Sequence, residues 1–338
     1  MPDRSAEKAA FLARAGWQDA ARAPLAGDAS NRRYERLRGG PEGTGAVLMD
    51  APPDTGEDVR PFVGIARHLA GLGLSAPGIL AEDTARGFLL IEDLGDALFA
   101  RVVAADPACE EDLYAAAVDL LVDLHRAAPP ARLDPYDAAT MAPLAGLAFD
   151  WYARALDAPV KDAEATRLLA AFQHRLEEVV PSVLILRDYH AENLIWLPER
   201  TGTARVGLLD FQDARIGHPA YDLVSLLEDA RRDVPEPLQT RIKARYVQAS
   251  GADPAAFDRA YALLGAQRNL RILGVFARLC LRDGKPGYLP LLPRVWGHLM
   301  RDLAHPALAD IRDSCLALLP PPDPAQFDRI ARRCHPTP

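Results

Sequence analysis

Apolar residues follow two different spacings in the first hundred positions of the chain. Over 61–74 they recur every three or four positions behind Pro61, which predicts a helix with the proline near its first turn. The runs 45–50 and 87–96 are short and apolar, which predicts strands, the second running into a turn. Residues 5–15 add a short helix. This part of the chain therefore predicts a small mixed β/α lobe.

From about residue 97 the apolar spacing becomes helical. The segments 109–127 and 164–180 each place their apolar residues on one side of a helix. Two short strand-like pieces, 183–187 and 204–211, interrupt the helices, and the pattern is helical again from 218 to 319. The whole pattern predicts an α+β fold in two lobes.

The boundary between these lobes is expected just after Asp93-Leu94-Gly95. Residues 1–95 then form a small mixed N-lobe, and residues 96–338 form a larger, mostly helical C-lobe.

Composition narrows the classes of partner. The chain has 338 residues, 49% of them hydrophobic, and a net charge of −8, so neither nucleic acid nor a membrane surface is an expected partner. No run approaches the ~18 apolar residues of a membrane span, and the N-terminus lacks the apolar run of a signal peptide. The four cysteines are scattered, which predicts reduced thiols without a zinc site. We expect a cytoplasmic protein.

The candidate chemistry lies in "LILRDYHAENLIWL", residues 184–197. Asp188 and Asn193 have the spacing of the protein-kinase loop His-Arg-Asp-x4-Asn, in which the Asp accepts a proton and the Asn holds magnesium. Asp210 follows seventeen residues after Asn193, and the intervening sequence reads as a hairpin that brings Asn193 and Asp210 side by side. We predict Asp188 as catalytic base and Asn193 and Asp210 as ligands of Mg²⁺. The alternative, solvent-exposed loop carboxylates, fits one isolated Asp-x4-Asn better than this conjunction.

No Rossmann or P-loop glycine motif is present, so the nucleotide needs another site. The small residues of "AGDASNRRY" permit a tight turn in which Ser30 and Asn31 face phosphate oxygens, although an ordinary turn has the same composition. The segment 90–94 is the candidate hinge for adenine, with Glu92 and Leu94 acting through their main chain.

The second motif, "VGLLDFQDARIGHPAYDLVSLL", together with "LRDYHAENLIWL", resembles the aminoglycoside phosphotransferase and choline kinase superfamily, with its protein-kinase-like fold. His190 matches the second His of that family's loop. The resemblance implies that Asp222, in Tyr221-Asp222-Leu223, supports the catalytic loop structurally. His125 also matches a family helix, but we interpret it as a core histidine.

A narrower likeness rests on "GDASNRRYERL", "LLIEDLGD" and "GAQRNLRILGVFARLCLRDGKPGYL". Together these segments look like the bacterial anomeric sugar kinases of peptidoglycan recycling. The resemblance implies ATP- and Mg²⁺-dependent phosphorylation of the C1 hydroxyl of N-acetylmuramic acid and N-acetylglucosamine. The nucleotide would bind residues 1–95, and the sugar would bind residues 96–338. We expect a monomer whose partner is a small amino sugar.

Two departures from the kinase pattern occur together. Met49 or Asp50 stands where the third strand usually carries a Lys, and the helix 61–74 has no Glu to pair with it. We predict that Arg32 and Arg33 neutralise the phosphates instead. Leu186 replaces the loop His, which we interpret as apolar packing against the loop.

A sugar site needs hydrogen-bonding groups, an apolar face and, for N-acetylmuramate, a cation for its carboxylate. For every candidate an ordinary core or surface role is an equal alternative. The candidates are His190, Asp213, Arg268, Asn269, Trp151 and Tyr152, with Arg271 nearby.

Two rival functions stay open at this stage. One is another small-molecule kinase of the superfamily, for aminoglycosides, choline or homoserine, although no aromatic cluster suggests a choline cage. The other is a pseudokinase that binds without catalysis, which the missing Lys, the missing Glu and Leu186 would favour.

Overall fold

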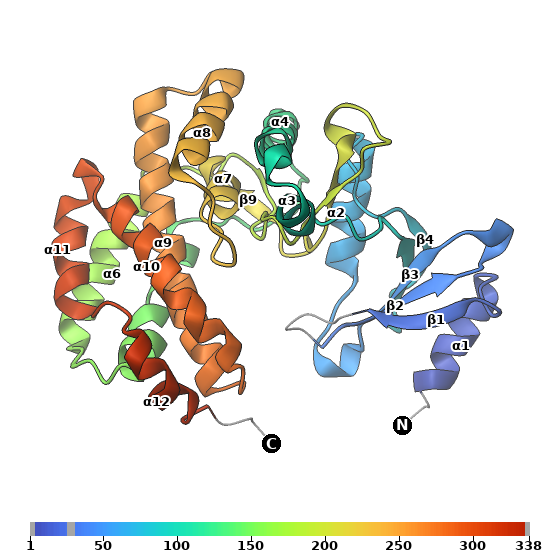
Figure 1. Cartoon of the computed structure of the whole chain (residues 1–338), viewed down its shortest axis with the longest axis horizontal. Coiled ribbons are helices and arrows are strands. Elements are labelled where there is room, and N and C mark those ends of the chain that lie inside the picture. Colours follow the sequence, from blue (N-terminus) through green and yellow to red (C-terminus); the bar gives the residue numbers. More distant parts are fainter. Residues whose placement is uncertain (1–3, 26–30, 335–338) are drawn as a thin grey trace. The chain divides into compact units, whose positions relative to one another are not determined.

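The computed structural model describes residues 4–25 and 31–334 of the chain (Figure 1). Contacts between residues divide it into two compact units. Unit 1 comprises residues 1–120 and 191–214, and unit 2 comprises 121–190 and 215–338. The segment 191–214 returns to unit 1 from the C-terminal half of the chain, which the sequence pattern did not indicate.

Unit 1 is built on a five-stranded antiparallel sheet of order β1-β2-β3-β5-β4. Helix α1 (Arg4–Arg14) packs against one face of it, as Figure 1 shows. Phe11 of this helix stacks on Phe88 with 5.5 Å between ring centroids, and Leu37, Leu48 and Leu90 complete the apolar layer. The strands are β1 (Ala21–Leu25), β2 (Arg33–Arg38), β3 (Ala46–Asp50), β4 (Ile79–Asp83) and β5 (Phe88–Glu92).

Three helices and a hairpin complete unit 1. Helices α2 (Arg60–Gly71), α3 (Phe99–Ala105) and α4 (Glu110–Arg126) follow the predicted order, with α4 continuing into unit 2. Strands β7 (Leu194–Trp196) and β8 (Val206–Leu208) pair antiparallel. The predicted hairpin is thereby confirmed.

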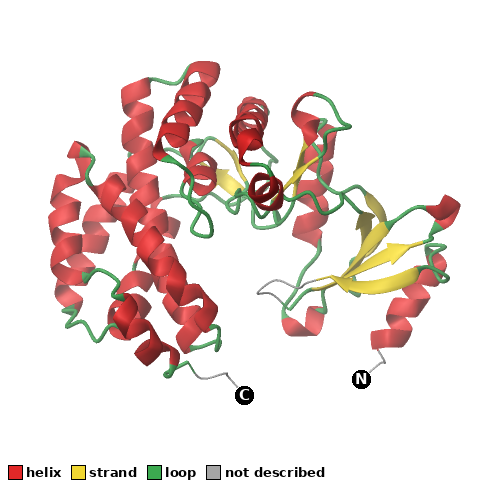
Figure 2. Cartoon of the chain, viewed as in Figure 1, coloured by secondary structure: helices red, strands yellow, loops and turns green. Residues whose placement is uncertain are grey.

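Unit 2 is almost entirely helical (Figure 2). Its longest element, α9 (Pro254–Leu281), is buried along most of its length and packs beside α10 (Leu292–Leu303). Gly274 allows the close approach of the chain before η4, since a Cβ there would lie 2.2 Å from the Leu147 carbonyl carbon. The other helices are α5 (Ala138–Ala145), η4 (Ala148–Ala153), α6 (Asp162–Leu176), α7 (Ala220–Leu227), α8 (Glu236–Ser250), α11 (Ala309–Leu318) and α12 (Phe327–Ala331).

One short sheet crosses unit 2. Strand β6 (Val183–Ile185) pairs antiparallel with β9 (Arg215–Gly217), and the predicted catalytic residue Asp188 follows three positions after β6. Single helical turns connect the larger elements of both units: η1 (Pro41–Gly43), η2 (Pro53–Thr55), η3 (Pro107–Cys109), η5 (Gly202–Arg205), η6 (Pro286–Leu291), η7 (Pro306–Leu308) and η8 (Pro324–Gln326).

The cysteines differ from the expectation of four reduced thiols. Cys280 at the end of α9 and Cys334 after α12 form a disulfide, with 5.1 Å between their Cα atoms. Cys109 and Cys315 are free. Sequence spacing did not indicate this pair, because the two residues are separated by 54 positions and meet only through helix packing. Within the described ranges, no helix has the length and apolarity needed to cross a membrane.

Candidate active site

The backbone of the predicted catalytic loop is held by one buried carboxylate. Asp222 of α7 accepts hydrogen bonds from the backbone N–H groups of Leu186, at 2.6 Å, and Arg187, at 2.8 Å. Arg187 has a left-handed backbone with φ of 70°, a conformation that a non-glycine residue adopts only when its surroundings enforce it. Asp188 follows at once, so Asp222 fixes the direction in which the chain presents it. This geometry agrees with the supporting role predicted for Asp222.

A second layer of contacts holds the same turn. The Ser225 hydroxyl donates to the Arg187 carbonyl at 3.1 Å, and Arg268 of α9 donates to that hydroxyl at 2.9 Å. The Arg187 guanidinium lies over the ring of Tyr136, 5.1 Å from its centroid. Leu186, at the position of the kinase His, is buried, as its predicted apolar packing requires.

Burial sets the electrostatics beneath the loop. It raises the pKa of Asp222 to about 7, against the two backbone N–H bonds that favour the carboxylate. Burial alone would lower the pKa of Arg271. The neighbouring Tyr221, Tyr136 and Asp188 instead hold it above its usual range. A guanidinium therefore stands within electrostatic reach of the predicted catalytic carboxylate.

The predicted metal ligands come together at the base of the β7/β8 hairpin. The Asn193 amide nitrogen lies 3.5 Å from Oδ2 of Asp210, and Gln212 donates to Oδ1 of Asp210 at 2.6 Å. Asp210 has a left-handed backbone with φ of 56°, and Phe211 beside it is buried against Phe62, with 4.8 Å between ring centroids. The hairpin and this aromatic contact place both side chains on a rigid support.

These groups suit a hard divalent cation. Mg²⁺ in phosphotransferases takes one or two carboxylate ligands and completes its shell with phosphate oxygens and water. Asp210 supplies a carboxylate, and a half-turn of the adjacent Asn193 amide presents its oxygen. Protein ligands alone do not build a closed cage here, since no cluster of three or more His, Cys, Asp or Glu side chains within the described residues has metal-binding geometry.

The predicted phosphate loop is only partly described, and Ser30 lies outside the described residues. Glu57 accepts from the Asn31 backbone N–H at 3.2 Å and from Arg32 Nε at 2.8 Å. Burial alone would lower the pKa of Arg32, but the hydrogen bond to Glu57 and the nearby Tyr34 raise this pKa above its usual range. Arg33 begins β2 and is exposed.

At the candidate hinge, Glu92 ends β5. Its carboxylate accepts from Arg200 at 2.5 Å and from the Gly78 backbone N–H at 3.2 Å. Leu94 is buried. The predicted nucleotide contacts through the main chain of these two residues stay a prediction.

Met49 and Asp50, the two positions considered for the missing Lys, are neighbours on β3 and therefore lie on opposite faces of the sheet. Asp50 lies on the sheet face that carries α1, where it pairs with Arg4 at 2.5 Å and Lys8 at 3.2 Å. Met49 therefore lies on the opposite face.

A cation that the sequence reasoning missed lies on the same face as Met49. Arg36 of β2 pairs with Asp93 at 2.8 Å and with Asp96 at 2.7 Å, which ties the sheet to the segment after the hinge. The sequence signal for these ion pairs was the acidic segment "EDLGD", residues 92–96.

The sugar candidates separate by burial. Tyr152 is fully buried and donates to the Pro320 carbonyl at 2.7 Å, and Asn269 is fully buried between Glu228 and Asp302. Both side chains have core roles in place of the predicted sugar contacts. Arg268 is likewise buried on Ser225, described above.

The remaining sugar candidates are more accessible or stand beside the loop. Asp213 is exposed and Trp151 half-buried. His190 is buried with Nε2 3.2 Å from Arg231, and burial lowers its pKa to about 4. His125 is the core histidine expected from the sequence, with Nδ1 2.8 Å from the Tyr246 hydroxyl.

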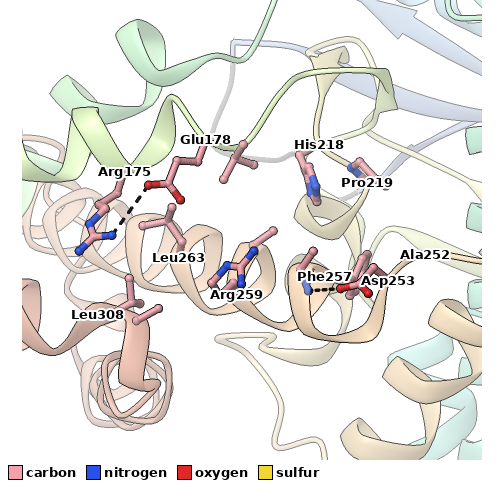
Figure 3. Close-up of a pocket in the computed structure, with 14 residues that line it drawn as sticks. Arg175, Glu178, His218, Pro219, Ala252, Asp253, Phe257, Arg259, Leu263 and Leu308 are labelled. Carbon is pink, nitrogen blue, oxygen red and sulfur yellow. Dashed lines mark hydrogen bonds and ion pairs between the residues drawn. The ribbon is translucent and has the colours of Figure 1, made fainter.

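Unit 2 also contains a cavity of about 260 Å³ that includes none of the predicted site residues (Figure 3). His218 and Pro219 line it where the chain enters α7, and Phe257 and Leu263 of α9 form its apolar wall. Two of the charged residues around it, Arg175 and Glu178, form an ion pair with each other. The predicted chemistry therefore lies outside this cavity.

A five-stranded sheet lobe, a helical remainder and an Asp-x4-Asn loop followed by a hairpin define a phosphotransferase of protein-kinase-like architecture. Residues 22–263 match the phosphotransferase enzyme family, and the chain belongs to this family. It is 41% identical to the N-acetylmuramate/N-acetylglucosamine kinase of Caulobacter vibrioides, over 92% of this chain and 95% of that protein. The kinase of the same name from Pseudomonas putida is 38% identical, with 84% of each chain covered.

Solved structures share the fold at lower identity. A choline/ethanolamine kinase family protein from Mesorhizobium loti superposes with a TM-score of 0.60 at 16% identity, covering 92% of this chain and 99% of that one. The aminoglycoside phosphotransferase APH(2'')-Ib in its ADP-bound form gives a TM-score of 0.55 at 13% identity, covering 86% and 94%. The predicted fold is confirmed by both.

Proposed function

We propose that this protein is an ATP- and Mg²⁺-dependent kinase that phosphorylates the anomeric C1 hydroxyl of N-acetylmuramic acid and N-acetylglucosamine. The observation that carries phosphotransfer is the pairing of Asn193 with Asp210 at the base of the hairpin, five residues after Asp188. The choice of sugar is supported by the printed names of relatives that match over most of both chains. We place the reaction in peptidoglycan recycling in the cytoplasm, where ATP is available.

Asp188 is the proposed base. It orients the C1 hydroxyl and accepts its proton while that oxygen attacks the γ-phosphorus of ATP. The bond between the γ-phosphorus and the bridging oxygen breaks, and its electron pair leaves with ADP. An anomeric hydroxyl is more acidic than an ordinary alcohol, so a weakly basic carboxylate removes its proton more readily. The left-handed turn at Arg187, held by Asp222, orients Asp188 for this role.

Asn193 and Asp210 are the proposed residues that hold Mg²⁺, which neutralises charge on the phosphates when bound. Arg32 is the proposed cation on the nucleotide side, where no Lys is present at Met49. Arg33, the other predicted cation, pairs in register with Asp50 and therefore belongs to the sheet face that carries α1. Asn31 and the main chain at Glu92 and Leu94 are further proposed nucleotide contacts.

On the acceptor side, His190, Asp213 and Trp151 remain the proposed sugar contacts. The first follows the catalytic Asp188 by two residues, and the other two retain accessible surface.

A coupled ADP-release assay tests this proposal with N-acetylmuramate, N-acetylglucosamine, choline and kanamycin as acceptors. We expect turnover of both amino sugars and neither of the other two. The N-acetylglucosamine product should also lose its reaction with reducing-sugar reagents, because a phosphate on C1 removes the free hemiacetal. Turnover of neither sugar would contradict the proposed substrate, and a product that still reduces would contradict the proposed position.

A further inference from the structure

Helix α9 changes character at Arg271. Every residue from Ala260 to Leu270 is buried. Beyond that point Arg271, Ile272, Val275, Arg278 and Leu279 are half-buried, and Arg271, Val275 and Arg278 follow one another at intervals of four and three positions, which places these three on one side of the helix. This stripe carries two guanidinium groups on a helix whose other sides are mostly packed.

Neither guanidinium is satisfied by the described residues. Arg271 has a single hydrogen bond there, a long one of 3.5 Å to the Tyr221 hydroxyl. Arg278 has no hydrogen bond or ion pair among them, and its Nε is buried without a partner. The rest of the Arg278 side chain is half-buried. A buried polar nitrogen without a partner is costly, and an anionic ligand beside it would supply the missing acceptor.

Two further arginines, Arg271 and Arg282, act on the charge of Arg278. Burial lowers its pKa, and repulsion from Arg282 and Arg271 lowers it further, while Asp283 opposes them. Asp283 is already engaged, since it accepts from Arg282 at 2.6 and 3.0 Å. At the other end of the stripe, the charge of Asp188 raises the pKa of Arg271. Asp188 is the residue that the proposed reaction places beside the acceptor hydroxyl.

We propose that Arg271 and Arg278 form an anion subsite that binds the lactyl carboxylate of N-acetylmuramate. The two proposed sugars are identical except for this lactyl ether on O3. An acceptor whose C1 hydroxyl meets Asp188 brings its substituents next to Arg271, and guanidinium groups bind carboxylates through charge-assisted hydrogen bonds. The subsite deepens the proposed function and rests on it, because it assigns the residues that recognise one of the two sugars.

The test is the ratio of kcat/KM for N-acetylmuramate to that for N-acetylglucosamine. In the double variant Arg271→Gln/Arg278→Gln we expect this ratio to fall by about tenfold or more, mainly through KM for N-acetylmuramate. The double variant Arg271→Lys/Arg278→Lys keeps both charges and should recover part of the ratio. Raising the salt concentration should lower the wild-type ratio and leave that of the Gln variant nearly unchanged.

Arg282→Gln is the matched control. It removes the same charge from the same end of α9, but its guanidinium is already paired with Asp283, so the ratio should stay within about twofold of wild type. Thermal unfolding of each variant reports on folding separately. A Gln double variant that keeps the wild-type ratio, or that loses both activities equally, would overturn the subsite. A wild-type protein that turns over neither sugar would instead overturn the proposed function.

Discussion

The two units bury polar groups in opposite ways. Unit 1 buries charges in shared ion pairs: Asp50 contacts both Arg4 and Lys8, and Glu35 contacts both Lys8, at 2.6 Å, and Arg22, at 2.8 Å. Each acid therefore has two cations, and the loss of one leaves another in place.

Unit 2 instead buries acidic and histidine side chains whose burial favours the uncharged form. Glu228 and Asp302 both accept from the Asn269 amide, at 2.7 and 3.0 Å, and burial raises the pKa of each. Burial lowers the pKa of His125 to about 3 and that of His218 to about 4. Among the described residues, no second charged partner compensates when one of these groups is removed or changes protonation state. Unit 2 is therefore predicted to be more sensitive than unit 1 both to single substitutions and to pH.

The largest expected effect separates the proposed role of Asp188 from that of Asp210. Asp188→Asn, in unit 2, should lower kcat by about 10²- to 10⁴-fold, as expected for loss of a general base, without changing the Mg²⁺ concentration for half-maximal activity. Asp210→Asn, in unit 1, should raise that Mg²⁺ concentration by at least about tenfold, because it removes the carboxylate ligand. Mg²⁺ titrations of both variants measure the difference. Wild-type turnover in Asp188→Asn would refute the assignment of the base.

The next effect compares one buried Asp from each unit. Asp222→Ala leaves one buried and one partly buried backbone N–H group without this acceptor and should lower the free energy of unfolding by about 2–5 kcal/mol. Asp50→Ala should cost only about 1–2 kcal/mol, since Lys8 keeps Glu35 and Arg4 is partly exposed to water. Urea unfolding of both variants measures the two losses. Equal losses would remove the proposed difference in redundancy.

A smaller effect tests the pH sensitivity of unit 2. The folded pKa of His125, about 3, lies below its ordinary value of 6.5. Its contribution to stability is therefore complete above pH 6.5 and is lost as the pH falls toward 3. At pH 4.5 the loss should reach about 2–3 kcal/mol relative to pH 7.

The measurement compares His125→Asn with wild type in urea at several pH values. The difference between the two proteins isolates this group from buried acids, whose raised pKa values give the opposite slope. His174→Asn, at an exposed position of α6, is the control and should follow wild type. A stability difference that does not change between pH 7 and 4.5 would contradict a buried neutral imidazole.

Features that depend on neighbouring residues in the chain were predicted well from the sequence. The hairpin between Asn193 and Asp210 was predicted because its geometry depends on nearby apolar runs and turn residues, which are short-range patterns. The helical segments of unit 2 were predicted for the same reason. The edge strands have weaker patterns: β1 contains Pro24 and is largely exposed, and β4 carries Glu82 and Asp83. Such residues protect a sheet edge and weaken the strand signal.

The polar interior of unit 2 was harder to predict. Arg268 and Asn269 were candidate sugar contacts, and the sequence left an ordinary core or surface role as an equal alternative. Their roles follow from partners more than forty positions away, Ser225 and Glu228, which only tertiary packing brings close. Asp50 had a usable signal: strand alternation puts it on the same face as Leu48, toward α1.

The smallest expected effect probes the redundancy of unit 1 directly. Lys8→Met removes the cation shared by Glu35 and Asp50, yet Arg22 still pairs with Glu35 and Arg4 with Asp50. The apolar stem of Met keeps the packing of the Lys side chain, so we expect a change in the free energy of unfolding of about 1 kcal/mol or less. The double variant Lys8→Met/Arg4→Met leaves Asp50 without either of its two cations and should cost clearly more than the sum of the single changes, because only then is a buried carboxylate left uncompensated. Additive losses in urea unfolding would show that the two cations act independently.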